Sequence, residues 1–525
     1  MKRSVQHRED ERIGLQTNLD AHKTQAERNR MGQFSTPPAL ARDILEYAAR
    51  LFPAGEPVRF LDPAIGTGAF YAALRQVFPD QIVREATGFE IDPHYGEPAD
   101  RLWRDTGLHL AISDFTTASP ERRFNLVVCN PPYVRHHHLE SDEKARLHQA
   151  TDRASAMQLS GLAGLYCHFV GLAHAWMEEG GIAGWLIPSE FMDVNYGQAV
   201  KRYLSRQVTL LHIHRFDPSD VQFADALVSS AVVWFQKRPP PPGHAVTFSF
   251  GGSLAQPKTV RQVPLDALAA EPKWSRFPVA AVRARSIEPT ISDFFRIKRG
   301  VATGDNSFFI LPEEELRARD LPRSAFRPIL PSPRYVKDDI IEADASGNPL
   351  LDRRLFLLDP GLPETEICER FPNLWAYLEE GKARGLHERY LCRHRALWYA
   401  QEARPPSPIV CTYLGRGDAK SGRPFRFILN RSQATVANVY LAMYPTPLLA
   451  RAASQKPELI RDVWEALNRI APSELLGEGR VYGGGLHKLE PKELANVPVP
   501  GIAALLPHEL RPVGQGEMFN VIAAE

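Results

Sequence analysis

The chain has 525 residues, of which 44% are hydrophobic and 24% are charged. This length exceeds one ordinary domain, and the composition suits two or three folded domains rather than a disordered chain. The 63 basic residues nearly balance the 62 acidic ones, which excludes a polybasic protein that binds polyanions indiscriminately. A nucleic-acid surface on this protein must therefore be local.

The cysteines and the chain's hydropathy point to a cytoplasmic protein. The 5 cysteines are scattered, with no CxxC pair and no histidines at zinc spacing, so we expect reduced thiols and no metal. There is no run of about 18 apolar residues, and the first residues lack the apolar core of a signal peptide. We expect no membrane association.

In the first half of the chain, strands alternate with helices. Residues 1–31 are strongly polar and are expected to form a mobile or helical N-terminal arm. Apolar residues at helical spacing then predict a helix over residues 39–52. Three short apolar strands follow, VRFLDP, ATGFEID and FNLVVCNPP, with segments between them that can be helical. A further helix is expected over residues 163–181. This alternation predicts βαβ units in a mostly parallel sheet.

A proline-rich segment, RPPPPG, is the best domain boundary in the sequence, because it can form neither a helix nor a central strand. It predicts a first domain over residues 32–237, a linker over 238–244 and a second domain over 245–525. The second domain has many prolines and mixed short apolar runs, which indicates an α+β fold.

The segment DPAIGTGAF, residues 62–70, lies between a strand and a helix. Gly66 and Gly68 permit a tight turn that a ligand can approach closely, followed by unpaired helix N–H groups. About 20 residues later, Glu90 ends the second strand, where a carboxylate can accept both hydroxyls of a ribose. Asp114 ends a third strand and can accept from an adenine amino group, with Phe115 packed on the ring. These residues predict a nucleotide-type pocket.

The tetrapeptide Asn130-Pro131-Pro132-Tyr133 ends the strand FNLVVC. Its two prolines stop the strand and fix the backbone. The Asn130 side-chain oxygen and the Pro131 carbonyl can then point into one pocket as rigid acceptors, with the Tyr133 ring beside them.

In the order FSTPP, DPAIGTGAF, GFEID, SDF, NPPY and FADALVSSAVVWFQK, the chain resembles the gamma-class N6-adenine DNA methyltransferases of bacterial type II restriction–modification systems. The resemblance is looser in the second half, in VATGDNSFFI, RHRALWYA and YGGGLHKLEPKELANVPVP. It implies an α/β fold, with a Rossmann-like S-adenosylmethionine-dependent methyltransferase domain followed by an α+β target-recognition domain.

The resemblance also implies residue roles. The cofactor S-adenosylmethionine is expected to contact Thr36, Pro37, Asp62, Ala64, Gly66, Gly68, Glu90, Ile91, Asp114 and Phe115. The catalytic motif is Asn130, Pro131, Pro132 and Tyr133, and the flipped-out target base is expected to stack on Tyr133 and Phe223. In this reaction the two acceptors of the motif take the N–H bonds of adenine N6, which then attacks the methyl group directly, without a metal.

Positive charge is concentrated in the second half of the chain. Residues 239–525 carry 37 basic and 33 acidic side chains, against 26 and 29 in the first 238 residues. Basic side chains in two enriched stretches are expected to contact DNA phosphates or guanines: Arg296, Lys298, Arg299, Arg416, Lys420 and Arg423.

Three other functions remain open at this point. The same tetrapeptide can activate a protein glutamine amide, although such enzymes lack a large C-terminal extension. An RNA N-methyltransferase is the second alternative, and a non-enzymatic DNA-binding regulator is the third. We expect a monomer that acts on double-stranded DNA and protects it from a separately encoded restriction endonuclease, because too few residues precede FSTPP for a fused nuclease.

Overall fold

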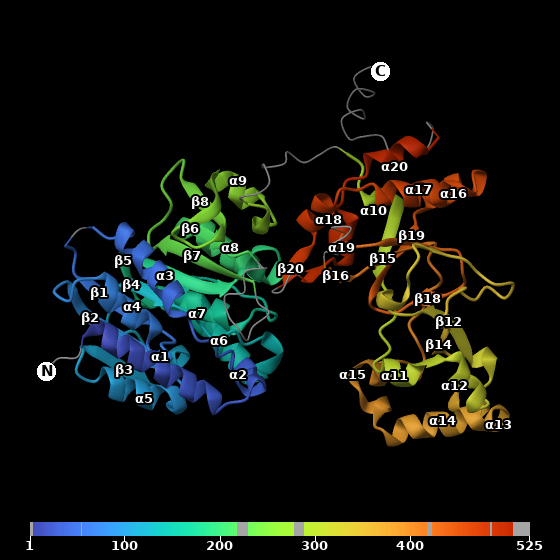
Figure 1. Cartoon of the computed structure of the whole chain (residues 1–525), viewed down its shortest axis with the longest axis horizontal. Helices are drawn as coiled ribbons and strands as arrows, with labels where there is room; N and C mark the ends of the chain where they lie inside the picture. Colours follow the sequence, from blue (N-terminus) through green and yellow to red (C-terminus); the bar gives the residue numbers. More distant parts are fainter. Residues whose placement is uncertain are drawn as a thin grey trace, which may run out of the picture. The chain divides into compact units, whose positions relative to one another are not determined.

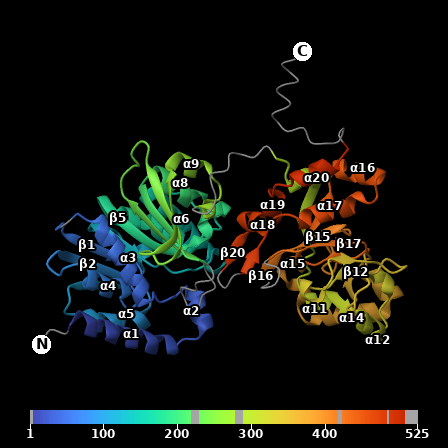
Figure 2. The same ribbon diagram turned by 45° about the horizontal axis from the view of Figure 1, so that its top comes forward.

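The computed structural model describes residues 4–53, 55–217, 229–277, 288–416, 423–482 and 486–507. Contacts divide the chain near residue 285 into two compact units, which are described separately (Figures 1 and 2). Unit 1 holds residues 1–284, and unit 2 holds nearly all of the remaining chain. Among the described residues, no helix is long and apolar enough to cross a membrane.

Unit 1 alternates helices and strands along most of its length. Its strands are β1 (Val58–Asp62), β2 (Val83–Glu90), β3 (Leu108–Ile112), β4 (Phe124–Cys129), β5 (Met177–Pro188), β6 (Thr209–Arg215), β7 (Ser230–Gln236), β8 (Ala245–Gly252) and β9 (Pro257–Pro264). Its helices are α1 (Val5–Ala21), α2 (Gln25–Met31), α3 (Pro38–Leu51), α4 (Ala69–Val77), α5 (Pro93–Trp103), α6 (Ser141–Ser155), α7 (Leu165–Ala173), α8 (Gln198–Arg206) and α9 (Leu265–Ala270).

In the described part of unit 1, the strands form one nine-stranded sheet in the order β3-β2-β1-β4-β5-β7-β6-β8-β9. The first five of these strands are parallel, and β7 runs antiparallel to both of its neighbours. This confirms the expected Rossmann-like α/β fold. Because the strands are parallel, the carboxyl ends of β1, β2 and β4 meet at one edge, where such sheets bind ligands.

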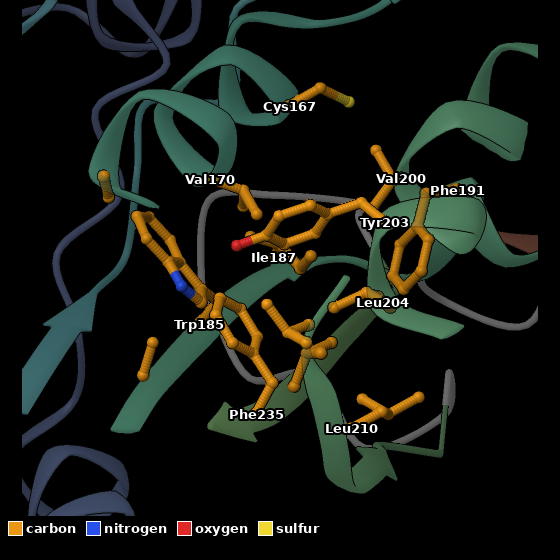
Figure 3. Packing of buried hydrophobic residues seen from close by; sticks show 14 of the residues in the cluster. Cys167, Val170, Trp185, Ile187, Phe191, Val200, Tyr203, Leu204, Leu210 and Phe235 are labelled. Carbon is orange, nitrogen blue, oxygen red and sulfur yellow. The ribbon is translucent and has the colours of Figure 1, made fainter. Parts of the chain in front are cut away.

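Both faces of the sheet are buried, as expected of parallel strands. Along β4, Val127 and Cys129 belong to a core with α7 and α8, while Leu126 and Val128 belong to a core with α3 and α4. In the first core Tyr203 packs edge-on to Phe235, with ring centroids 5.7 Å apart (Figure 3).

The proline-rich segment is not the domain boundary. Strand β8, which follows it, pairs in parallel with β6, and β9 pairs with β8 in turn. Further on, Trp274 and Phe277 join the same core as Tyr203. The prolines therefore end β7 without ending the domain, since they occupy a connection between two strands of one sheet. The boundary lies near residue 285 instead of at 238–244.

One other expectation changes, and one that was left open is resolved. The helix expected over 163–181 ends at Ala173, and Met177 begins β5, because the following segment is bonded between β4 and β7. The N-terminal arm is helical, as α1 and α2, and α1 packs on α4 and α5. The polar composition of residues 1–31 gave no sign of this packing.

Unit 2 mixes short strands and helices, consistent with the expected α+β fold. Its described strands form three sheets, ordered β10-β19-β15-β17-β13, β11-β14-β12-β18 and β16-β21-β20. The strands are β10 (Phe295–Arg299), β11 (Ile310–Pro312), β12 (Phe326–Leu330), β13 (Ile340–Ile341), β14 (Leu355–Leu358), β15 (Ile409–Thr412), β16 (Leu414–Arg416), β17 (Phe427–Asn430), β18 (Thr435–Val436), β19 (Tyr440–Pro445), β20 (Arg480–Tyr482) and β21 (Leu486–Lys488). The helices are α10 (Ile291–Phe294), α11 (Asn306–Phe309), α12 (Glu313–Ala318), α13 (Glu364–Arg370), α14 (Pro372–Ala383), α15 (Tyr390–Arg393), α16 (Pro447–Gln455), α17 (Leu459–Asn468), α18 (Pro472–Glu478), α19 (Pro491–Ala495) and α20 (Pro500–Leu505).

Candidate active site

A cavity of about 340 Å³ opens at the carboxyl ends of β1, β2 and β4. This volume lies within the range of small-molecule pockets, roughly 300–1,000 Å³. The lining includes eight of the predicted site residues: Ala64, Gly66, Glu90, Ile91, Asp114, Phe115, Asn130 and Pro132. The sheet topology thus brings together residues that are up to 68 positions apart in the sequence.

The glycine-rich turn forms one wall of the cavity. Gly66 has a φ of +55°, and a Cβ at this position would have no heavy atom within 4 Å. A side chain would therefore occupy the open space of the cavity itself, which is what a ligand cradle requires. Gly68 is needed for a different reason, because its Cβ would lie 2.5 Å from Nε1 of Trp103.

Glu90 ends β2 and holds the turn in place. Its Oε2 accepts from the Gly66 N–H at 3.0 Å, and its Oε1 accepts from the Asp92 N–H at 2.9 Å. Burial raises the pKa of this carboxyl to about 7, although the two N–H groups favour its ionised form. Glu90 is thus a carboxylate poised to titrate near neutral pH.

At the far end of the cavity, Asp114 follows β3 and caps a short helical turn. One of its oxygens accepts from the Thr116 N–H at 2.8 Å and the other from the Thr116 hydroxyl at 2.9 Å. Phe115 is buried beside Phe89 and Phe169, with ring centroids 5.4 Å away in each case. Ile91 is 56% exposed and supplies apolar surface to the cavity.

Asn130 is the most informative side chain of the site. Its Nδ2 donates to the Phe34 carbonyl at 2.9 Å and to the Thr36 hydroxyl at 3.1 Å. These two bonds fix the amide orientation and leave Oδ1 buried with no hydrogen-bond donor. A buried acceptor that lacks a donor is uncommon and costs stability, so it indicates a binding function.

The rest of the tetrapeptide is held firmly. Pro132 lines the cavity and Pro131 is buried. The Tyr133 hydroxyl donates to the Leu186 carbonyl at 3.0 Å, and its ring lies 5.6 Å from that of Phe34. Stacking of a base on Tyr133 stays a prediction. Phe223, its expected counterpart, lies outside the described residues.

Four predicted cofactor residues do not line the cavity. Thr36 instead orients Asn130, Pro37 precedes α3, and Gly68 packs against Trp103. Asp62 is fully buried at the end of β1. Burial raises the pKa of its carboxyl to about 8, although hydrogen bonds from the Ala64 N–H and the Cys129 thiol act to lower it. In the structure these four residues shape the glycine turn and the surroundings of the loop Asn130–Tyr133.

The expected DNA-contacting residues lie in unit 2 or beyond the described chain. Arg296 and Lys298 alternate with the partly buried Ile297 along β10, so they share the opposite face of the strand. Arg299 lies 4.1 Å over the ring of Tyr413. Lys420 and the Arg416 side chain lie outside the described residues, and Arg423 is exposed.

Sequence reasoning missed one wall of the cavity, which is formed by the end of α1, the end of α2 and the segment after α2. Its lining residues are Gln16, Asp20, Arg30, Met31, Gly32, Gln33, Phe34 and Ser35. His138, the last of three consecutive histidines that follow the tetrapeptide, also lines the cavity. Within the described residues no three potential ligand side chains converge on a metal site.

This constellation defines a class of enzyme. A pocket at the carboxyl edge of a parallel sheet, with a glycine turn, a strand-end carboxylate and Asn-Pro-Pro-Tyr beside them, is that of a Rossmann-like methyltransferase. Residues 98–222 match the family described as Eco57I restriction–modification methylase, and residues 275–515 match the C-terminal domain of the type II methyltransferase M.Eco57I. The chain therefore contains domains of the Eco57I-type restriction–modification methylases, and its cofactor is S-adenosylmethionine.

Individual relatives also match this chain over most of its length. The chain is 29% identical over 501 residues to the type II methyltransferase M.XamI of Xanthomonas campestris pv. amaranthicola, covering 91% of this chain and 86% of the relative. It is 24% identical to the type II methyltransferase M.AccI of Acinetobacter calcoaceticus, covering 83% and 79%. The type IIL restriction–modification enzyme MmeI, solved in complex with DNA, shares the fold with a TM-score of 0.53 at 12% identity, over 87% of this chain and 63% of that one.

Proposed function

We propose that this DNA methyltransferase transfers a methyl group from S-adenosylmethionine to N6 of a flipped-out adenine in double-stranded DNA. The observation that carries the proposal is the fixed, buried Asn130 Oδ1, an acceptor with no donor at the edge of the cofactor cavity. A primary amino group on a base supplies the missing N–H.

The chemistry of the cavity lining supports this cofactor. We infer that Glu90 accepts the ribose hydroxyls, that Phe115 and Ile91 cover the adenine, and that the open space at Gly66 admits the methionine part. When bound, S-adenosylmethionine supplies an electrophilic methyl group. Asn130 and Pro132 line the same cavity as the residues that would hold the cofactor.

The chain's own part in the reaction is to prepare the nucleophile. The N6 lone pair is delocalised into the adenine ring, which makes the amino group a poor nucleophile. We infer that Asn130 Oδ1 and the Pro131 carbonyl accept its two N–H bonds, which favours a tetrahedral nitrogen. Because both acceptors are fixed before the base arrives, little reorganisation is needed.

The base specificity is tested by product analysis. The protein is incubated with S-adenosylmethionine carrying a labelled methyl group and with duplex DNA, duplex RNA or a glutamine-containing peptide. We expect label in DNA alone, recovered as N6-methyladenine after digestion to nucleosides. Label in N4-methylcytosine, in RNA or in the peptide would overturn the proposal.

Thr36 is proposed as a positioning residue for Asn130. Replacement Thr36→Val removes one of the two acceptors of Asn130 Nδ2 and keeps the side-chain shape. Because the Phe34 carbonyl still holds the amide, we expect kcat to fall by about tenfold, the effect of losing roughly 1.4 kcal/mol of orientation. Thr36→Ser should restore kcat, and the cofactor Kd should be unchanged in both variants. A Thr36→Val enzyme with normal kcat contradicts the role.

We further propose that unit 2 contacts DNA through the surface around α15. Tyr390 is 69% exposed and Leu391 is 41% exposed, unusually high for large apolar side chains. Arg393 lies 5.6 Å over the Tyr390 ring, and the His394 ring lies 4.6 Å from it. An exposed aromatic ring beside an arginine suits stacking on bases and pairing with phosphates.

Replacement Arg393→Ala tests this surface. We expect the Kd for target DNA to rise about five- to tenfold and the slope of log Kd against log salt to shrink by about one. Arg469→Ala removes an exposed arginine that pairs with Glu465 on α17 and serves as the matched control. Equal effects of the two replacements would count against the α15 surface.

The biological role follows from the same activity. We propose that methylation by the monomeric protein protects host DNA from a separately encoded restriction endonuclease that reads the same site. Sequencing the methylated positions in DNA from cells that express the protein gives the site. An endonuclease specific for that site should cut DNA from expressing cells less well than DNA from cells that lack the protein. Equal cutting of the two DNAs contradicts the protective role.

A further inference from the structure

The N-terminal helices are fastened to the loops of the cofactor cavity. Glu9 and Arg12 on α1 are buried as an ion pair, 5% and 2% exposed. Arg12 Nη1 also donates to the Thr67 hydroxyl at 3.2 Å, and that hydroxyl donates to Gln16 Oε1 at 2.6 Å. Thr67 lies between the two glycines of the turn, so α1 is anchored directly on the cofactor loop.

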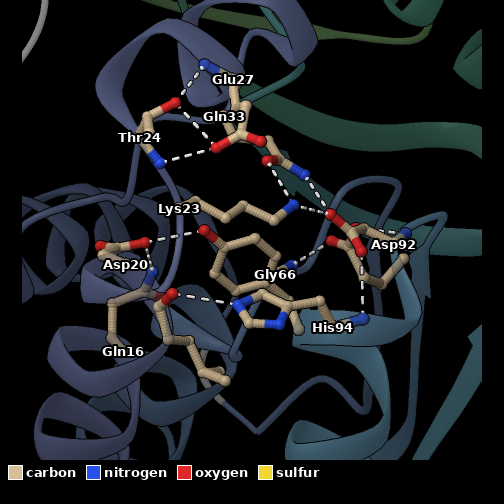
Figure 4. A network of polar contacts seen from close by, with 12 residues as sticks. Gln16, Asp20, Lys23, Thr24, Glu27, Gln33, Gly66, Asp92 and His94 are labelled. Carbon is tan, nitrogen blue, oxygen red and sulfur yellow. Dashed lines mark hydrogen bonds and ion pairs between the residues drawn. The ribbon is translucent and has the colours of Figure 1, made fainter.

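A second anchor joins the segment between α1 and α2 to the loop after Glu90 (Figure 4). Lys23 forms an ion pair with Asp92, and the Gln33 amide donates to the same carboxylate at 2.8 Å. The Asp92 backbone N–H donates in turn to Glu90 Oε1 at 2.9 Å. Asp92, through its carboxylate and its backbone N–H, thus connects the N-terminal segment to the predicted ribose ligand.

Between the two anchors, α1 presents polar side chains to the cavity. Gln16 and Asp20 both line it, and Asp20 accepts from the Tyr95 hydroxyl at 2.9 Å. S-Adenosylmethionine carries two positive charges, on its sulfonium and its amino group, and Asp20 is an acidic side chain placed in this wall. Asp62, the acidic residue of the glycine turn, does not line the cavity.

The chain after α2 packs directly against the loop Asn130–Tyr133. Gly32 has a φ of +65°, its carbonyl accepts from the Tyr133 N–H at 3.2 Å, and a Cβ on it would lie 2.4 Å from that nitrogen. The next residues include Phe34 and Thr36, which orient Asn130. The position of α1 and α2 is therefore coupled to the orientation of the catalytic amide.

From these contacts we propose that residues 5–31 form a cap that is part of the cofactor site. In this cap Gln16 and Asp20 face the bound cofactor, and the Lys23–Asp92 pair holds the cap closed over Glu90. The proposal rests on the proposed function only in its choice of ligand. It adds a binding element that lies outside the two matched family segments, 98–222 and 275–515.

The test uses the full chain and S-adenosylhomocysteine, the demethylated form of the cofactor. Hydrogen exchange of peptides from residues 5–31 is followed by mass spectrometry with and without saturating ligand, and Kd is measured by calorimetry. We expect ligand to slow exchange in these peptides several-fold. Lys23→Met should weaken this protection and raise Kd about tenfold, and Asp20→Asn should raise Kd as well.

Arg42→Met is the matched control, because it breaks an exposed ion pair with Glu46 on α3 that does not reach the cavity. If Lys23→Met fails to fold, Gln33→Ala takes its place in the comparison. This variant removes the hydrogen bond from the Gln33 amide to Asp92. Unchanged exchange in residues 5–31, or a Kd within twofold of the control in both cap variants, overturns the cap. A wild-type chain that binds no S-adenosylhomocysteine overturns the proposed function instead.

Discussion

Replacement of Asn130 by alanine is expected to lower kcat for methyl transfer by about 10³-fold or more, while the cofactor Kd stays within about twofold. The variant loses the fixed Oδ1 acceptor at the cavity edge and keeps the glycine turn and Glu90. A loss of this size corresponds to roughly 4 kcal/mol of transition-state stabilisation. The Phe34 carbonyl and the Thr36 hydroxyl also lose their donor, so a small decrease in thermal stability is expected.

Single-turnover methylation of a DNA duplex gives the rate, and calorimetric titration with S-adenosylhomocysteine gives the Kd. Asn195→Ala is the matched control, since it makes the same chemical change at an exposed position of unit 1 that does not line the cavity. If the Asn130 variant turned over at a rate close to that of the control, the catalytic assignment would be wrong.

Affinity for the cofactor is expected to fall about tenfold between pH 8 and pH 6, because Glu90 must be ionised to accept the ribose hydroxyls. Its folded pKa, about 7, lies above the usual carboxyl value of 4.5. The contribution of this group to folding stability is therefore present below pH 4.5 and is lost as the pH rises through 7. Bound cofactor offsets that loss, so ligand should raise the melting temperature more at pH 8 than at pH 6.

Proton release on binding provides an independent measurement. At pH 6, titrations in buffers of different ionisation enthalpy should show that close to one proton leaves when the ligand binds. Glu90→Gln should bind more weakly at every pH and lose the pH dependence. This control separates Glu90 from Asp62, whose pKa burial raises to about 8 in the same turn. If the cofactor Kd of Glu90→Gln still depends on pH, the titration belongs to another group.

The parts of the fold predicted from sequence depend on local signals. The strands that end at Asp62, Glu90 and Cys129 are short apolar runs, each followed by a turn that only certain residues can form. Parallel pairing then places their ends together without further information. For this reason Gly66, Glu90 and Asn130 could be assigned to one pocket before the structure was known.

The parts that were missed depend on contacts between distant residues. Helix α1 buries the charged pair Glu9 and Arg12, so no apolar periodicity indicated that it packs against the domain. Thr36 was assigned to the cofactor by resemblance, and only the fold shows that its hydroxyl accepts from Asn130, 94 residues away. The proline-rich segment, judged by its local chemistry alone, indicates a domain boundary. The strands that follow it pair with the sheet of unit 1, so the domain continues past it.

Because the nine-stranded sheet continues past the proline-rich segment, it restricts the positions at which two such chains can be joined in a chimaera. A chimaera joined at residue 238 would replace β8 and β9, leave the backbone of β6 without its parallel partner and remove Trp274 from the core. A junction near residue 285 keeps every described strand of the nine-stranded sheet in one parent. Unit 2, which we propose contacts the DNA, thus begins about 40 residues later than the proline-rich segment suggests.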